Sequence, residues 1–219
     1  MKLKYAIFDL DGTVLDSLPM WESVGLDTLR AQGYDPDPAL NRELRTLTMA
    51  DGAKLCKELF SMPESIEEIV RMVEDQALSA YHHTIVPKAG MEALLQRLKE
   101  AGIPMCIATS TQRYLVEAGL RRCGLMEFFD GIFTCPEVGQ GKKEGPAVYE
   151  AALRHMGGTK EEALVFEDAL HAIQTAKAAG FRVAAIYDPA SDGEHEEIRS
   201  LCDLYISSYE ELLSTGFPE

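Results

Sequence analysis

The fold is decided by the stretch 5–17, which reads YAIFDLDGTVLDS. Its first residues are apolar and predict a buried strand over 5–10 that turns at Gly12. Two carboxylates, Asp9 and Asp11, stand where this strand ends, and open α/β sheets bind ligands at the carboxyl ends of their strands. Burying two neighbouring carboxylates costs free energy unless a cation is close. A turn or a cap after the strand would also explain the pair, so the other strand ends must decide between these interpretations.

Further apolar runs alternate with helical patterns along most of the chain. They predict strands over 103–108, 131–134, 163–166, 181–187 and 204–207. Continuously apolar strands that are separated by helices are typical of a parallel sheet covered on both faces. We therefore expect an α/β fold with a doubly wound parallel sheet.

The region 16–85 breaks this alternation and predicts an all-helical insertion. It contains helical patterns over 17–32, 38–47, 50–60 and 65–81 and no convincing strand. Pro87 and Gly90 mark the return to the sheet. The expected domains are a catalytic core of residues 1–15 and 86–219 and a helical domain of residues 16–85.

Composition excludes some classes of function and location. The net charge of -15 argues against a nucleic-acid partner, because phosphate backbones are bound by basic surfaces. The five cysteines form no CxxC pair and are odd in number, so we expect reduced thiols and a cytoplasmic protein. No stretch approaches the roughly 20 apolar residues that span a bilayer, which predicts no membrane association.

Two other predicted strand ends carry groups that suit a phosphorylated ligand. The strand over 103–108 is followed by Thr109 and Ser110, whose hydroxyls could bind phosphate oxygens. A glycine-rich loop over 139–146 presents Lys142 and Lys143 ahead of a helix. Taken singly, Thr109 is as well explained as a helix N-cap, and the lysines as solvated side chains.

A second acidic pair, Glu167 and Asp168, follows the strand over 163–166. Oxygen ligands of this kind suit Mg²⁺. Acidic residues at a helix N-terminus are also common without a metal, because they complement the helix dipole. Four strand ends that supply acids, hydroxyls, lysines and acids together favour one phosphate-binding magnesium site.

The chain resembles the haloacid dehalogenase superfamily, in the branch with a helical cap inserted after the first strand. The matching motifs are FDLDGTVLDS at 8–17, Thr109, a lysine within 141–146, and Glu167-Asp168 followed by AKAAG at 176–180. The resemblance covers nearly the whole chain and implies a Rossmann-like core with a helical cap of about residues 16–85. It also implies a monomer that acts on a small phosphorylated metabolite.

The resemblance implies a role for each acidic residue. Asp9 would attack phosphorus and form an aspartyl-phosphate, which divides one difficult step into two. Asp11 would protonate the leaving alcohol and then deprotonate water. Mg²⁺ would be held by Asp9, Asp168, Glu167 and the backbone carbonyl of Asp11. Such a cation offsets a repulsion of about 4 kcal/mol between two like unit charges roughly 4 Å apart at an effective dielectric of about 20.

The phosphate-binding groups implied by the resemblance are Thr109, Ser110 and one lysine of the loop. Relatives carry Gly-Lys-Pro-x-Pro, and here Glu144 replaces the first proline. Counting back from Pro146 selects Lys143, whereas counting forward from the preceding glycine selects Lys142. We predict Lys143.

Other enzyme classes of the superfamily fit the residues less well. Phosphosugar mutases carry a histidine where this chain has Trp21 and an arginine near the position of Met49, and they lack the Thr found at Thr13. Dehalogenases need no metal and lack an acid at the position of Asp11. A catalytically idle binding protein remains a third alternative, although all four motif positions are filled. We therefore expect a magnesium-dependent phosphatase for a sugar-phosphate-like substrate.

The sequence leaves the choice of substrate open, because cap residues decide it. Arg45, Lys54 and Arg113 could each bind a substrate anion, but exposed helix cations explain them equally well.

Overall fold

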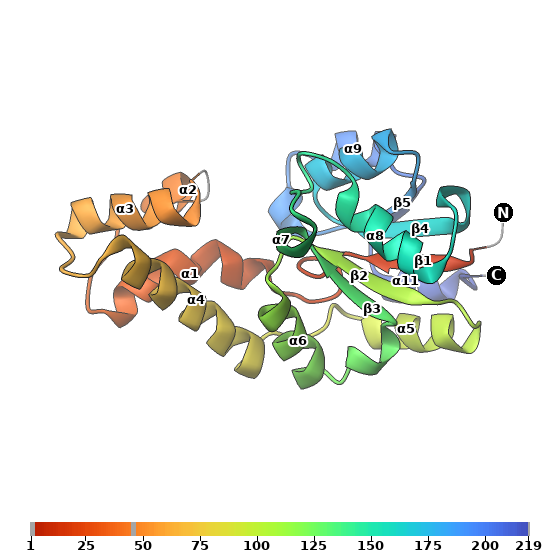
Figure 1. The fold of residues 1–219 in the computed structure, drawn as a ribbon, viewed down its shortest axis with the longest axis horizontal. Coiled ribbons are helices and arrows are strands. Elements are labelled where there is room, and N and C mark those ends of the chain that lie inside the picture. The colour runs from red at the N-terminus through yellow and green to blue at the C-terminus, as the bar shows by residue number, and fades with distance from the viewer. Residues whose placement is uncertain (1–2, 45–46, 219) are drawn as a thin grey trace. The chain divides into compact units, whose positions relative to one another are not determined.

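A six-stranded parallel sheet forms the centre of the larger part of the molecule. The computed structural model describes residues 3–44 and 47–218 (Figure 1). The strands are β1 (Tyr5–Phe8), β2 (Met105–Thr109), β3 (Gly131–Thr134), β4 (Ala163–Glu167), β5 (Arg182–Ile186) and β6 (Leu204–Ile206). Their order in the sheet is β3-β2-β1-β4-β5-β6. The predicted doubly wound α/β fold is thereby confirmed.

The order of the strands reverses beside β1. From β1 the chain builds the sheet outward through β2 and β3, and it then returns to the other side of β1 with β4. Phe8 at the end of β1 is in register with Ile107 of β2 and Phe166 of β4. Residues that follow these three strands therefore emerge together, at the switch point where open α/β sheets bind ligands.

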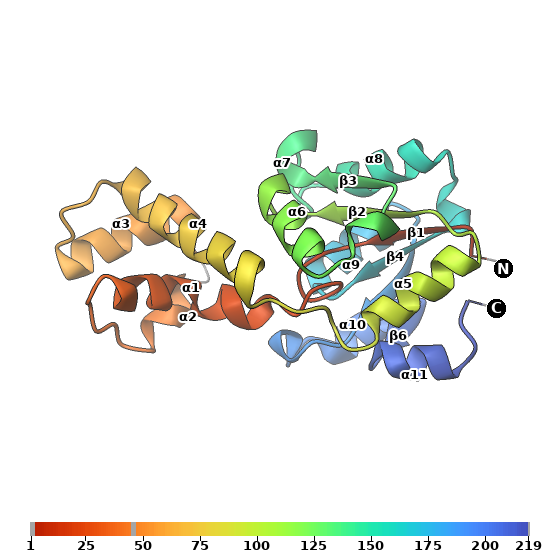
Figure 2. The ribbon, with the colours of Figure 1, turned by 90° about the horizontal axis from the view of Figure 1, so that it is seen from below.

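Helices cover both faces of the sheet (Figures 1 and 2). They are α5 (Met91–Glu100), α6 (Arg113–Arg122), α7 (Cys135–Val138), α8 (Ala147–Met156), α9 (Leu170–Ala178), α10 (His195–Leu201) and α11 (Tyr209–Ser214), with short 3-10 turns at Met126–Phe128, Lys160–Glu162 and Pro189–Ser191. Ile7 and Val165 join residues of α8, α9 and α10 in one hydrophobic cluster. Phe8 and Phe166 stack with ring centroids 4.3 Å apart and are also fully buried. Alternate residues of each strand are thus buried on opposite faces, which explains the continuously apolar strand sequences.

Residues Ser17–Ile85 form a second compact unit, apart from the unit of Met1–Asp16 and Val86–Glu219. It consists of α1 (Leu18–Ala31), α2 (Leu40–Leu44), α3 (Met49–Phe60) and α4 (Ile66–His83), and α4 packs against α1 and α3. The structure gives α2 fewer residues than the helix predicted over 38–47, and residues 45 and 46 lie outside the described residues.

Apolar contacts and local caps hold the helical unit together. Leu26, Leu29 and Ile69 are among the buried residues of its hydrophobic cluster. Ser65 and Glu68 form a capping box at the start of α4, in which each side chain bonds the backbone of the other. In the described part of the chain, no helix is both long and apolar enough to cross a membrane.

Candidate active site

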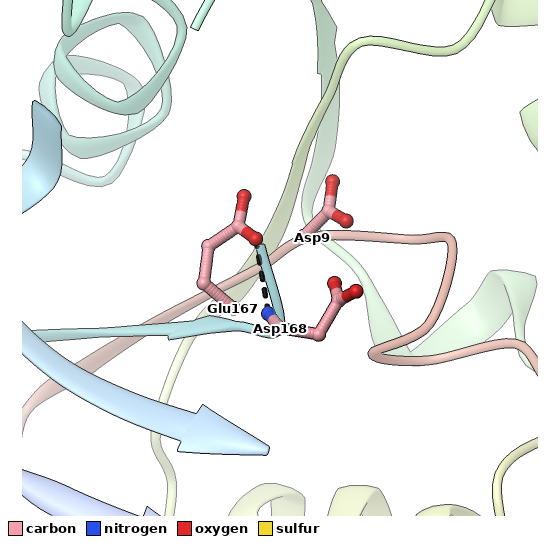
Figure 3. Close-up of side chains that lie close together, drawn as sticks. All are labelled: Asp9, Glu167 and Asp168. Atoms are coloured by element: carbon pink, nitrogen blue, oxygen red, sulfur yellow. Dashed lines mark hydrogen bonds between the residues drawn. The ribbon is translucent and has the colours of Figure 1, made fainter. Parts of the chain in front are cut away.

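Three carboxylates meet at the switch point of the sheet. Asp9 directly follows β1 and donates its backbone N–H to Phe166 O at 2.9 Å. Glu167 is the last residue of β4, and Asp168 follows it. Figure 3 shows the three side chains side by side, and a carboxylate oxygen from each lies within 4.8 Å of the others. All are buried, with exposed fractions of 7%, 0% and 4% respectively.

Lys142 is the cation of this cluster. Its side chain is 4% exposed, and its Nζ donates to both Asp9 Oδ1 and Glu167 Oε1. Burial alone would lower the pKa of Lys142, but the charges of Asp9 and Glu167 outweigh burial and raise the pKa well above its usual value. Lys142 is therefore a permanent positive charge within a buried, predominantly acidic site.

The structure brings Lys142, and not the predicted Lys143, to the acidic cluster, and the side chain of Lys143 is exposed. The reason is the conformation of the loop before α8. Glu144 donates its N–H to Gly141 O at 3.0 Å, and its carboxylate accepts from Gly141 N–H at 3.2 Å. Lys142 lies within this tight turn and its side chain is buried, whereas Lys143 next to it is exposed.

Glu167 is fully bonded by protein groups. Its Oε1 accepts from Lys142 and from the Tyr149 hydroxyl at 2.9 Å. Its Oε2 accepts from the backbone N–H groups of Asp168 at 3.0 Å and Ala169 at 3.2 Å. A carboxylate has about four lone-pair sites, so Glu167 has little capacity left. Asp9 and Asp168 retain the freer oxygens.

The pKa values of Asp9 and Asp168 reveal a shortage of positive charge. Burial raises the pKa of Asp9 to about 7, with Lys142 opposing the shift and Glu167 and Asp11 adding to it. Burial and the neighbouring charges of Glu167 and Asp9 raise the pKa of Asp168 well above its usual value, although Lys142 again opposes. One ammonium does not neutralise three buried carboxylates.

This donor set fits a magnesium ion. Mg²⁺ prefers carboxylate oxygens, and the three acids present hard oxygen ligands on one side of a buried site. A divalent cation would also favour the ionised forms of the two aspartates, whose pKa values are raised by burial and by the neighbouring carboxylates. The structure thus supports a metal at the position where the sequence predicts one.

Several residues around the acids were not given a role by sequence reasoning. Thr13 is fully buried and donates its hydroxyl to Asp168 Oδ1 at 3.1 Å. Tyr209, from the far end of the chain, donates its hydroxyl to Thr13 O at 3.1 Å. Tyr149 has the sequence pattern of an ordinary core residue of α8, so only the fold reveals its contact with Glu167. For Thr13 the available signal was its place in the first motif.

The hydroxyl-rich segment after β2 divides into different environments. Thr109 is buried, and its Oγ1 accepts the backbone N–H of Thr111 at 3.2 Å. The Thr111 hydroxyl donates to Asp11 Oδ2. Ser110 is exposed and donates its hydroxyl to Cys135 Sγ at 3.7 Å. The structure therefore brings Thr111 to Asp11 and turns the Ser110 side chain toward the end of β3.

The candidate anion-binding cations of the helices have separate positions. Arg113 bonds Glu137 through two nitrogens and Ile132 O at 2.7 Å, which accounts for it as a structural residue. Lys54 is exposed on α3 of the helical unit. Arg45 lies outside the described residues.

Comparisons with known proteins show the family of this chain. The family model for haloacid dehalogenase-like hydrolases matches residues 6–186. Hexitol phosphatase A of Escherichia coli is 31% identical over 225 residues, which cover 100% of this chain and 97% of the relative. A phosphorylated carbohydrates phosphatase of Thermotoga maritima is 24% identical over 88% of this chain and 89% of its own length.

Solved structures match as well. A Thermotoga maritima protein provisionally assigned as a beta-phosphoglucomutase has a TM-score of 0.87 at 22% identity, covering 99% of this chain and all of that protein. CbbY from Rhodobacter sphaeroides, in complex with phosphate, has a TM-score of 0.77 at 27% identity over 96% of both chains. With the family model covering most of the sequence, the chain belongs to the haloacid dehalogenase-like hydrolases.

Proposed function

We propose that this chain hydrolyses the phosphomonoester of a small sugar or polyol through a covalent phosphoryl intermediate on Asp9. That it is a phosphatase of its family follows from the family match and from the relatives that share most of its length. The substrate class and the residue roles are the proposal. The observation that carries it is the placement of Asp9 at the switch point beside Lys142, Glu167 and Asp168.

Asp9 is proposed as the nucleophile. One carboxylate oxygen of Asp9 attacks phosphorus, and the bond from phosphorus to the ester oxygen breaks. The Lys142 ammonium at Asp9 opposes the effect of burial on the pKa of this carboxylate and favours its ionised, nucleophilic form. Asp9 is buried and bonded to Lys142, which orients its carboxylate before the substrate arrives.

Asp11 is proposed as the general acid and base. In the first step its carboxylic proton passes to the leaving ester oxygen, which departs as an alcohol. In the second step the Asp11 carboxylate takes a proton from water, whose oxygen attacks the phosphoryl group. The bond between phosphorus and Asp9 then breaks, inorganic phosphate leaves, and Asp11 is again protonated.

The metal site is proposed to use Asp9 and Asp168 as carboxylate ligands, with Glu167 and the backbone carbonyl of Asp11 as further candidates. When bound, Mg²⁺ supplies charge that offsets the repulsion between the nucleophile and the phosphate. Thr13 holds Asp168 in place through its hydroxyl. Thr109 and Lys142 are proposed to bind the phosphoryl oxygens, with Ser110 as a further candidate at the same strand end.

The unit of Ser17–Ile85 is proposed to act as the cap that selects the substrate. Trp21, which occupies the position of the histidine of related mutases, donates its indole N–H to the Tyr81 hydroxyl at 3.0 Å within this unit. An indole engaged in this way offers no acid or base, which supports hydrolysis over the transfer of a phosphoryl group back to a sugar. Interconversion of two phosphosugar isomers without phosphate release would establish a mutase instead.

The test is phosphate release from p-nitrophenyl phosphate with Mg²⁺, with EDTA, and with the Asp9→Asn variant. We expect release that requires both Mg²⁺ and Asp9, while the exposed control variant Asp192→Asn keeps full activity. Hexitol phosphates and aldose phosphates then define the substrate class. Release that persists in Asp9→Asn would contradict the proposed nucleophile.

A further inference from the structure

The contact between Thr111 and Asp11 has no part in the mechanism described so far. Thr111 lies two residues beyond the end of β2, just before α6, and its hydroxyl donates to Asp11 Oδ2. Because β1 and β2 are adjacent, with Phe8 in register with Ile107, the residues that follow both strands lie close together. The sheet itself thus brings this hydroxyl to Asp11.

The backbone around Thr111 is held by a local turn. Its N–H donates to Thr109 Oγ1 at 3.2 Å, a bond between residues two apart that is typical of turns built on Ser and Thr. The Thr109 oxygen serves here as an acceptor, so its own proton is available for a phosphoryl oxygen. One turn therefore fixes both the hydroxyl proposed to bind phosphate and the hydroxyl that meets Asp11.

The Asp11 carboxylate needs such a partner. The backbone after Asp11 is fixed, because Gly12 donates its N–H to Leu15 O at 2.9 Å and Asp11 forms a β-bridge with Leu15. Its side chain is only partly buried, unlike that of Asp9. An acid that must deliver a proton to one particular oxygen loses efficiency when its carboxylate rotates freely.

We propose that Thr111 is a positioning residue, which holds one oxygen of Asp11 so that the other faces the leaving oxygen of the substrate. This inference rests on the proposed role of Asp11 as general acid and base. A hydroxyl suits the task because it both donates and accepts hydrogen bonds. Before the proton transfer, the Thr111 hydroxyl either donates to or accepts from the Asp11 carboxylic acid. After the proton has gone to the alcohol, the hydroxyl donates to the Asp11 carboxylate.

The test compares two substrates that differ in their need for an acid. The value of kcat/KM reports the steps up to the departure of the first product. In p-nitrophenyl phosphate this product leaves as p-nitrophenolate, without being protonated, whereas the alcohol of a hexitol phosphate needs a proton. We expect Thr111→Val to lower kcat/KM for the hexitol phosphate at least about 10-fold and that for p-nitrophenyl phosphate less than about threefold. Thr111→Ser keeps the hydroxyl and should keep most of the kcat/KM for the hexitol phosphate. The control variant Thr175→Val removes a hydroxyl from α9 and should change neither kcat/KM.

A double-variant experiment separates positioning from a general structural defect. In the Asp11→Asn background, Thr111→Val should cause little further loss, because the two residues act as one unit. Equal losses for both substrates, or losses that multiply in the double variant, would overturn the inference. If Thr111→Val melts at a much lower temperature, the same comparison is made with Thr111→Ser and Thr111→Ala. A wild-type chain that releases no phosphate from either ester would instead contradict the proposed function.

Discussion

The edge of the core sheet that holds Asp9, Glu167 and Asp168, called here the catalytic edge, differs in its polar contacts from the helical unit. At the catalytic edge, buried polar groups pair over long distances in the sequence, as with Lys142 and Asp9, 133 positions apart, and Thr13 and Asp168, 155 positions apart. In the helical unit, several polar contacts are local caps, such as the Ser65–Glu68 box, whose members are 3 positions apart, although Trp21 also bonds Tyr81, 60 positions away. The helical unit also has a partly open apolar pocket of about 150 Å³ whose lining includes Val24, Gly52 and Met62.

The two regions should therefore differ in how well they tolerate substitutions. A buried network of charges loses function when one member is removed, because the partners remain buried and uncompensated. A helical unit held by caps and loosely filled apolar packing accepts substitutions at modest cost in stability. The proposed division of labour, with chemistry in the core and substrate choice in the helical unit, has this physical basis.

The largest expected effect comes from removing the buried cation. Lys142→Met leaves three buried carboxylates without their ammonium, so we expect kcat to fall on the order of 100-fold or more and the free energy of unfolding without metal to fall by about 3 kcal/mol. Lys143→Met, one position along the same loop, removes an exposed charge and should change neither quantity. Equal effects of the two substitutions, measured by steady-state kinetics and urea unfolding, would contradict the assignment of Lys142.

Through Asp9, lowering the pH should stabilise the core, whereas in ordinary acid unfolding a lower pH destabilises it. The pKa of Asp9 rises from 3.8 to about 7 on folding, so between these values only the folded state holds the proton. The stability that Asp9 contributes is fully present below the pKa of the unfolded state and is lost as pH rises through the pKa of the folded state. The free energy of unfolding changes by an amount on the order of 4 kcal/mol.

The measurement is urea unfolding in EDTA across this pH range, for the wild type and Asp9→Asn. The difference in unfolding free energy between them should depend on pH as described, and Mg²⁺ should remove the dependence because the metal holds the ionised carboxylates. Parallel curves for wild type and Asp9→Asn would show that Asp9 does not carry the shift.

A smaller effect is expected at the capping box of the helical unit. Ser65→Ala removes the acceptor of the Glu68 N–H bond, so we expect a loss of about 1 kcal/mol in the free energy of unfolding. Ser65→Thr keeps an acceptor hydroxyl and should keep most of this stability. The requirement for Mg²⁺ should not change in either variant. Loss of magnesium-dependent release in Ser65→Ala would contradict the proposed division of labour between the two units.

The smallest effect tests the packing of the helical unit against that of the core. A Cβ at Gly52 on α3 would lie 3.5 Å from Leu44 Cδ2, an ordinary contact, so Gly52→Ala should stabilise the protein by about 1 kcal/mol. In the core, Gly90 has a φ of +79°, and its Cβ would lie 2.9 Å from the backbone N of Glu210, so Gly90→Ala should destabilise. The melting temperatures of the two variants should therefore shift in opposite directions.

The sequence predicted those parts of the site that follow directly from strand ends. Asp9, Glu167 and Asp168 were found because a continuously apolar run stops at each acid, and parallel strands bring such ends to one edge. The sequence favoured Lys143, whereas the structure places Lys142 at Asp9; the difference lies in a turn between Gly141 and Glu144, which residue spacing does not reveal. Thr111 was given no role from the sequence, since its partner Asp11 is 100 positions away.

Trapping of the covalent intermediate tests whether the phosphoryl group leaves the substrate by way of Asp9. Asp11→Asn should form the aspartyl-phosphate from p-nitrophenyl phosphate and Mg²⁺ but hydrolyse it slowly, because water lacks its base. Rapid quenching, reduction with borohydride and peptide mass spectrometry should then find homoserine in place of Asp9. Release of p-nitrophenol with Asp9 unmodified, or with the label on another residue, would contradict the account.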